Sequence, residues 1–142
     1  MTKDDASALA LVGVSLCDAS GRLDAWSRAL FLASLLIVLF GAPAFDVRLM
    51  AAACLACAGG EAFFACRLAF DRPVFAAWAR LDEDGAMRAF DAALKHAWGK
   101  NPAADLPLSA RVAGVRRLAV RQAAAFAGQI IVLVWLGICH VR

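Results

Sequence analysis

The stretch that decides the fold is residues 29–45, ALFLASLLIVLFGAPAF, in which no charged side chain occurs. It lies between Arg28 and Asp46. A helix of about 17 residues, rising 1.5 Å per residue, covers most of a hydrocarbon core that is about 30 Å thick. The stretch is therefore typical of a transmembrane helix. Its length and lack of charge serve as the standard for finding other spans in the chain.

Two more windows of similar length are almost free of charge. Residues 49–66 contain a single charged residue, Glu61, and residues 122–141, QAAAFAGQIIVLVWLGICHV, contain no Asp, Glu, Lys or Arg. Hydrophobic residues make up 63% of the 142, more than a soluble domain of this size can bury. We predict an all-α integral membrane protein with three transmembrane helices, at about 28–45, 49–67 and 119–141, in a single membrane domain covering residues 1–142.

The Lys and Arg residues indicate how the chain is oriented. Three spans place the N-terminus and the segment between the second and third spans on the same side of the membrane. That side would carry all the Lys and Arg residues except Arg48 and Arg142. Because positive charge accumulates on the cytoplasmic side, the N-terminus and residues 68–118 are predicted to be cytoplasmic and the C-terminus periplasmic. A sequence rich in Ala and Arg, with no Tyr, suggests a bacterial inner membrane.

Residues 68–118 are predicted to form a cytoplasmic or interfacial segment of amphipathic helices. Apolar residues recur there at helical spacing, as at Met87, Phe90 and Leu94. These helices could pack on one another or lie on the membrane, with Trp78 and Trp98 at the head groups, or they could dock a partner protein. Just before the third span, four arginines are expected to contact lipid head groups: Arg111, Arg116, Arg117 and Arg121.

Three polar residues are predicted to lie at a similar depth in the three spans. Ser34 and Glu61 are each six residues from the cytoplasmic end of their span, and Gln129 is eight residues from it. A charged carboxylate facing lipid costs several kcal/mol, so Glu61 should face the inside of a helix bundle or be protonated. Three roles remain open for this predicted layer: a hydrogen-bonded link between helices, movement of a proton or ion, and contact with a partner subunit.

The second span also contains small residues and two cysteines. Ala52, Ala56 and Gly60 recur every four residues, a spacing that lets two helices pack closely. Cys54 and Cys57 match the CxxC spacing, but the chain has no second CxxC or histidine pair to complete a zinc site. We expect the cysteines to be packing residues.

No motif for a chemical reaction occurs in the sequence. It has no P-loop, no HExxH and no paired membrane histidines that could ligate a haem, so we expect neither an enzyme nor a cofactor. Acidic residues alternate with the basic ones, which argues against nucleic-acid binding. The expected partners are the lipid bilayer and either further copies of the chain or other membrane subunits. The expected role is that of an accessory or scaffold protein. The alternative is a homo-oligomeric ion or proton channel, or a small-solute transporter, that uses Glu61.

Overall fold

The computed structural model describes residues 3–40, 44–80, 83–99 and 106–140, and its elements are all helices. The prediction of an all-α fold is confirmed. Three of the helices are long and apolar enough to cross a membrane, judged by length and composition, as expected of a multi-pass membrane protein. In chain order the helices are α1 (Lys3–Phe40), α2 (Phe45–Arg80), α3 (Glu83–Trp98) and α4 (Leu108–His140).

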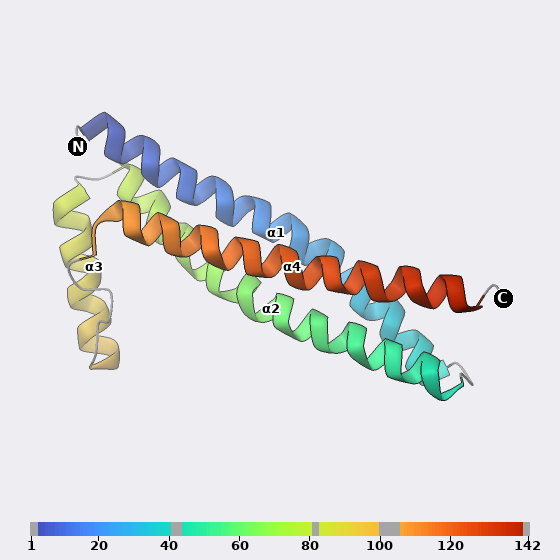
Figure 1. Cartoon of the computed structure of the whole chain (residues 1–142). Coiled ribbons are helices and arrows are strands. Elements are labelled where there is room, and N and C mark those ends of the chain that lie inside the picture. The colour runs from blue at the N-terminus through green and yellow to red at the C-terminus, as the bar shows by residue number, and fades with distance from the viewer. Residues whose placement is uncertain (1–2, 41–43, 81–82, 100–105, 141–142) are drawn as a thin grey trace.

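The three long helices lie side by side in an elongated bundle (Figure 1). Helix α2 runs antiparallel to α1 and α4, so the N-terminus of the chain lies at one end of the bundle and the C-terminus at the other. The short helix α3 lies across the end that holds the N-terminus. We call this the α3 end, and the opposite end, where α1 leads into α2, the turn end.

The long helices extend well beyond the predicted spans at the α3 end. Helix α1 begins at Lys3, α2 continues to Arg80 and α4 begins at Leu108. The polar residues in these extensions did not end the helices, because the extensions pack against one another through an apolar core. The described part of residues 68–118 comprises the last part of α2, all of α3 and the first part of α4. Residues 41–43, between the first two helices, lie outside the described residues.

Individual residues explain where α1 begins and α3 ends, and one proline lies inside α2. Asp4 and Asp5 lie in the first turn of α1, where negative charge is favoured by the helix dipole. Pro73 lies inside α2, which continues through it to Arg80. Helix α3 ends at Trp98 and is followed by Gly99, whose φ of 69° suits glycine and whose N–H donates to the Lys95 carbonyl.

The packing of the bundle follows a repeat of seven residues, the pattern of a left-handed coiled coil. In α1 the repeat consists only of small residues, and in α2 and α4 larger residues lie opposite them. One interhelix pair is Gly13 with Phe75. Three heptads further along α1, and three back along α2, Ser34 lies beside Cys54. The buried repeats are Ala6, Gly13, Ser20, Ser27 and Ser34 in α1, Cys54, Glu61, Leu68 and Phe75 in α2, and Leu108, Val115, Gln122 and Gln129 in α4.

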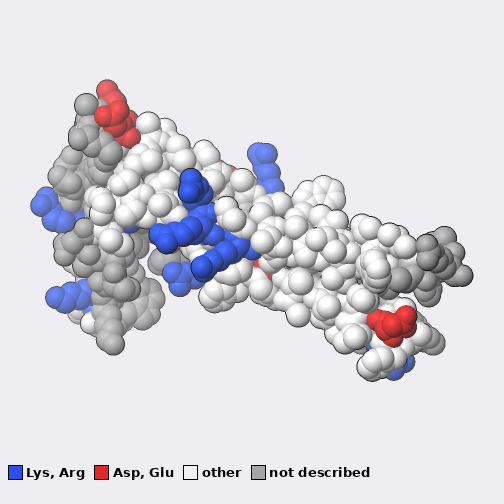
Figure 2. All heavy atoms as spheres, viewed as in Figure 1, with Lys and Arg blue, Asp and Glu red and all other residues white. Residues whose placement is uncertain are grey.

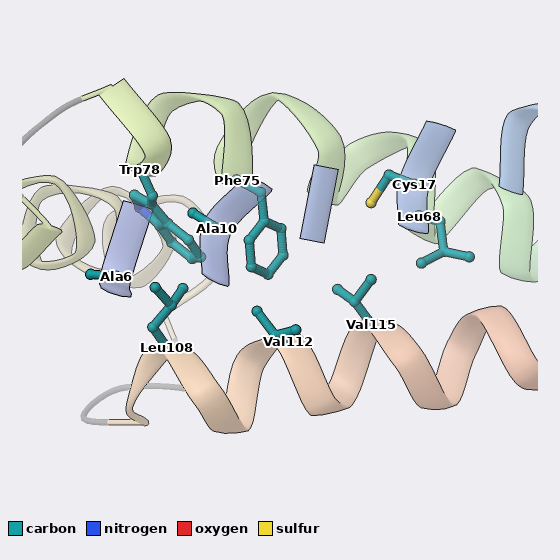
Figure 3. Close-up of a cluster of buried hydrophobic side chains, with 9 residues drawn as sticks. All are labelled: Ala6, Ala10, Cys17, Leu68, Phe75, Trp78, Leu108, Val112 and Val115. Carbon is teal, nitrogen blue, oxygen red and sulfur yellow. The ribbon is translucent and has the colours of Figure 1, made fainter. Parts of the chain in front are cut away.

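The interior of the bundle changes character along its length. Towards the α3 end it is apolar, and Figure 3 shows the side chains of Phe75 and Trp78 pointing from α2 towards α4. Met87 and Phe90 of α3 pack against the same core. Towards the turn end the buried residues are mostly polar or small. The buried polar side chains in the described residues are Ser20, Ser27, Ser34, Glu61, Gln122 and Gln129.

The outer surface shows the reverse distribution: it is charged towards the α3 end and apolar towards the turn end. Figure 2 shows Lys and Arg side chains gathered about midway along the bundle and at the α3 end, whereas the half towards the turn end is mostly uncharged. Large apolar side chains are exposed on that half, which is the arrangement expected of helices surrounded by lipid. They include Phe31, Leu32, Leu36, Leu39, Leu49, Phe63, Ile131, Val134, Trp135 and Ile138.

Candidate functional site

The three residues of the predicted polar layer all lie inside the bundle. Ser34 and Gln129 are completely buried, and Glu61 is 1% exposed. Each of them is hydrogen-bonded to a different partner, so the prediction of one shared layer is wrong. The reason is the register between the helices, which places the three residues at successive levels of the bundle rather than at one level.

Glu61 is hydrogen-bonded to Gln122 of α4. The Gln122 amide nitrogen, Nε2, donates to Glu61 Oε1 over 2.5 Å and to the backbone carbonyl of Ser20 over 3.1 Å. One glutamine therefore links all three long helices. Its side chain is fully buried, and its Oε1 has no hydrogen-bond partner in the described structure.

The sequence analysis did not identify Gln122, which stands directly after Arg121 at the edge of the third apolar window. The signal that would have found it is its spacing, because Gln122 lies seven residues before Gln129 and seven after Val115. A seven-residue repeat places all three on the face that meets the other helices.

Ser27 and Gln129 form the next level towards the turn end. Ser27 Oγ donates to Gln129 Oε1 over 3.1 Å, and Gln129 Nε2 donates to Ser27 Oγ over 2.8 Å. At the following level Ser34 Oγ lies 3.1 Å from the sulfur of Cys54 and 2.9 Å from the carbonyl of Leu30 in its own helix. These contacts show what the arrangement does chemically: it satisfies polar side chains in pairs between helices, where no bulk water is available.

Four cysteines in the described part of the chain are free thiols: Cys17, Cys54, Cys57 and Cys66. Cys54 is buried beside Ser34, and the sulfur of Cys57 would lie 3.2 Å from a Cβ added at Gly128. Among the described residues no group of three or more His, Cys, Asp or Glu side chains could hold a metal ion. Cys139 is also a member of the predicted set, but its side chain lies outside the described residues.

Cys17 lies in the apolar core outside the predicted spans. Burial, reinforced by the carboxylates of Asp71 and Asp18 and opposed by Arg72, raises the pKa of its thiol to about 11. Burial also raises the pKa of Asp71, against the influence of Arg67. Because a thiol must ionise to act as a nucleophile, the burial that packs Cys17 into the core also lowers its reactivity at neutral pH.

The predicted helix-packing row of Ala52, Ala56 and Gly60 does not face the other helices of the chain. Ala52 and Ala56 are exposed, and a Cβ added at Gly60 would meet nothing within 4 Å. The prediction that this row packs against another helix therefore stays a prediction, and it concerns a helix outside this chain. Helix α2 packs through the neighbouring face, because the seven-residue repeat, not the four-residue one, follows the bundle axis. The small residues on the packed face are Ala51, Ala58 and Ala65.

Arg111 does not belong with the other arginines that were expected to contact lipid. Its guanidinium donates two hydrogen bonds to Asp91 of α3, at 3.1 and 2.7 Å, and lies 5.3 Å from the ring centre of Trp78. The Arg111 side chain is only 9% exposed, so the prediction of head-group contact is wrong for this residue. Its contacts hold α3 against the bundle.

Trp78 was expected at the membrane surface under one of the two alternatives for the amphipathic helices. It is instead buried, with its ring edge-to-face against Phe75 and Phe90. The apolar face of α3 therefore packs on the end of the bundle. The side chain of Trp98 lies outside the described residues. The other three predicted head-group residues, Arg116, Arg117 and Arg121, are exposed on α4.

Comparison with known proteins gives no family to which the chain can be assigned. No family model matches the chain, no curated protein matches it, and no solved structure matches it. The buried polar contacts between α1, α2 and α4 are therefore the features from which a function must be argued.

Proposed function

We propose that the chain is a small accessory or scaffold protein of the bacterial inner membrane, which acts by assembling with itself or with a larger membrane complex. The observation that carries the proposal is the distribution of polar groups in the turn-end half of the bundle. There, polar side chains are inside and hydrogen-bonded, and large apolar side chains are outside. A rigid apolar exterior suits contact with lipid and with other transmembrane helices.

The same distribution supports a depth for the bundle in the membrane. We place the turn-end half in the hydrocarbon core, with the exposed Arg116, Arg117 and Arg121 at the cytoplasmic head groups. The α3 end then projects into the cytoplasm, and the C-terminus is periplasmic. The excess of Lys and Arg at the projecting end supports this orientation. A reporter that works only in the cytoplasm, fused to residue 142, should be inactive, and activity there would overturn the orientation.

The exposed row of Ala52 and Ala56 supports assembly. Two small residues four apart on an outward face of α2 leave room for a helix of another subunit to approach. Sizing of the native complex in mild detergent should show a particle larger than one chain, and Ala56→Leu should reduce it. Ala123→Leu, on an exposed position of α4, is the matched control. A monomeric wild type that co-purifies with no membrane partner would contradict the proposal.

A second candidate function is a homo-oligomeric channel for ions or protons, or a small-solute transporter, that uses Glu61. The observation that favours it is a buried carboxyl beside an amide oxygen that lacks a donor. Flux through vesicles that contain the purified protein would separate the two functions. No flux in the wild type would exclude transport, and flux that Glu61→Gln leaves unchanged would exclude Glu61 from the path.

A further inference from the structure

A buried carboxyl and a buried amide meet between α2 and α4, and their hydrogen bonds are incompletely matched. Gln122 Nε2 has two hydrogens, and both are used, one on the Ser20 carbonyl and one on Glu61 Oε1. Gln122 Oε1 receives no hydrogen bond in the described structure. An unsatisfied buried acceptor costs about 1–3 kcal/mol, so a donor at this position would stabilise the bundle.

The charged groups at this level of the bundle do not supply that donor. On α1, Arg28 is 75% exposed and bound to Asp24 of its own helix, and its charge also interacts with that of Glu61. The Asp24 carboxylate is itself an acceptor, and its Oδ1 has no hydrogen-bond partner in the described structure. Arg22 on α1, Arg67 on α2 and Arg121 on α4 are exposed. An ionised Glu61 would therefore be a buried charge stabilised at Oε1 by a neutral amide, an arrangement that is costly without a closely paired cation.

We propose that Glu61 and Gln122 form a proton-binding site in the centre of the bundle. The Glu61 carboxyl carries the proton on Oε2 and donates it to Gln122 Oε1, while Gln122 Nε2 donates to Glu61 Oε1. Two parallel hydrogen bonds then join the acid and the amide, and the orphaned oxygen is satisfied. Proton uptake converts the carboxylate to the neutral acid, with no other bond made or broken.

A metal cation would suit the same position less well. Hard cations such as Mg²⁺ and Ca²⁺ require about six or more oxygen ligands, and the Ser20 carbonyl is already occupied by the Gln122 amide. No group of three or more metal-binding side chains was found among the described residues. A proton requires only the two oxygens that the site offers. This inference depends on the packing of α2 against α4 and holds for either of the functions proposed above.

Infrared spectroscopy of the full chain in lipid nanodiscs tests the site, because a neutral carboxyl and a carboxylate absorb at different frequencies. At pH 7 the wild type should show a neutral-carboxyl C=O band. Glu61→Gln should abolish the band, and Asp46→Asn, at an exposed position of α2, should leave it unchanged. Identical carboxyl spectra for the wild type and Glu61→Gln would overturn the proposal.

Two further measurements keep the test decisive. Glu61→Gln should fold as well as the wild type, since the introduced amide can donate to Gln122 Oε1 and accept from Nε2. Should this variant fail to fold, the wild-type spectrum at pH 7 replaces it, and the absence of a neutral-carboxyl band there would refute the site. Gln122→Leu should shift the band by removing its partner, and an unshifted band would refute the acid–amide pair. The same spectra with added Na⁺ or Mg²⁺ should be unchanged, and loss of the band on adding either ion would favour a metal site instead.

Discussion

Ser27 of α1 and Gln129 of α4 hydrogen-bond to each other across a separation of 102 residues, the same separation that joins Ser20 to Gln122 one heptad earlier. The two helices therefore keep a single register over this part of the bundle. Polar pairs at core positions of a coiled coil are known to fix register, and this pair does so where the interior is otherwise made of small residues.

Ser27→Ala should destabilise the bundle by about 1 kcal/mol, because the Gln129 amide loses its partner in a buried site. Adding Gln129→Leu should restore part of the loss, since no polar group is then left unpaired. Reversible unfolding in mixed detergent micelles measures both effects. Ser15→Ala is the control: Ser15 is exposed and bonds to the Leu11 carbonyl of its own helix. Equal effects at the two serines would contradict the pairing.

Gly13→Ala should destabilise the protein by about 1–3 kcal/mol, because an added Cβ would lie 2.6 Å from Cδ1 of Phe75. The matched control is Gly21→Ala in the same helix, where a Cβ would meet nothing within 4 Å. The control should be neutral or stabilising by up to about 1 kcal/mol, since alanine favours a helix over glycine. Combining Gly13→Ala with Phe75→Leu should recover stability, and failure to do so would show that the clash lies elsewhere.

Arg111→Lys should loosen α3 from the bundle even though the charge is kept. Lysine cannot make two parallel hydrogen bonds to Asp91 or stack its head group on Trp78 as a planar guanidinium does. We expect amide hydrogen exchange in α3 to accelerate by about tenfold or more while α1 and α4 are unaffected. Arg117→Ala, at an exposed position of the same helix, should leave exchange in α3 unchanged. Unaltered exchange in Arg111→Lys would mean that the apolar face alone holds α3.

Cys17 should resist thiol reagents in the folded protein. With a pKa of about 11, its thiolate fraction at pH 8 is about a hundredfold below that of an ordinary exposed cysteine. A membrane-permeant maleimide should therefore label the exposed Cys66 much faster than Cys17, as read by mass spectrometry of the digested protein. Raising the pH should increase the rate at Cys17 progressively, and denaturation should equalise the two sites. Equal rates in the folded state would contradict the burial of Cys17.

The heptad repeat explains which parts of the candidate site could be predicted. Glu61 was expected to face inward because a lone carboxylate in an apolar window has few alternatives, and Ser34 and Gln129 followed from their distance to the nearest arginine. Depth along a helix does not determine which side chain lies opposite, so Gln122 was missed. Small residues also recur on two faces of α2, and the spacing along one helix does not show that the face with Ala51, Ala58 and Ala65 is the one that meets α1 and α4.

The sequence alone determined that the chain is helical and that three of its segments are apolar over lengths suited to a membrane, because helix rise and hydropathy are local properties. Only the tertiary structure decided which polar groups bond, that Arg111 binds Asp91 rather than facing lipid, and that α3 packs across the end of the bundle. Those contacts join residues far apart in the chain, and they depend on the register that the three long helices adopt together.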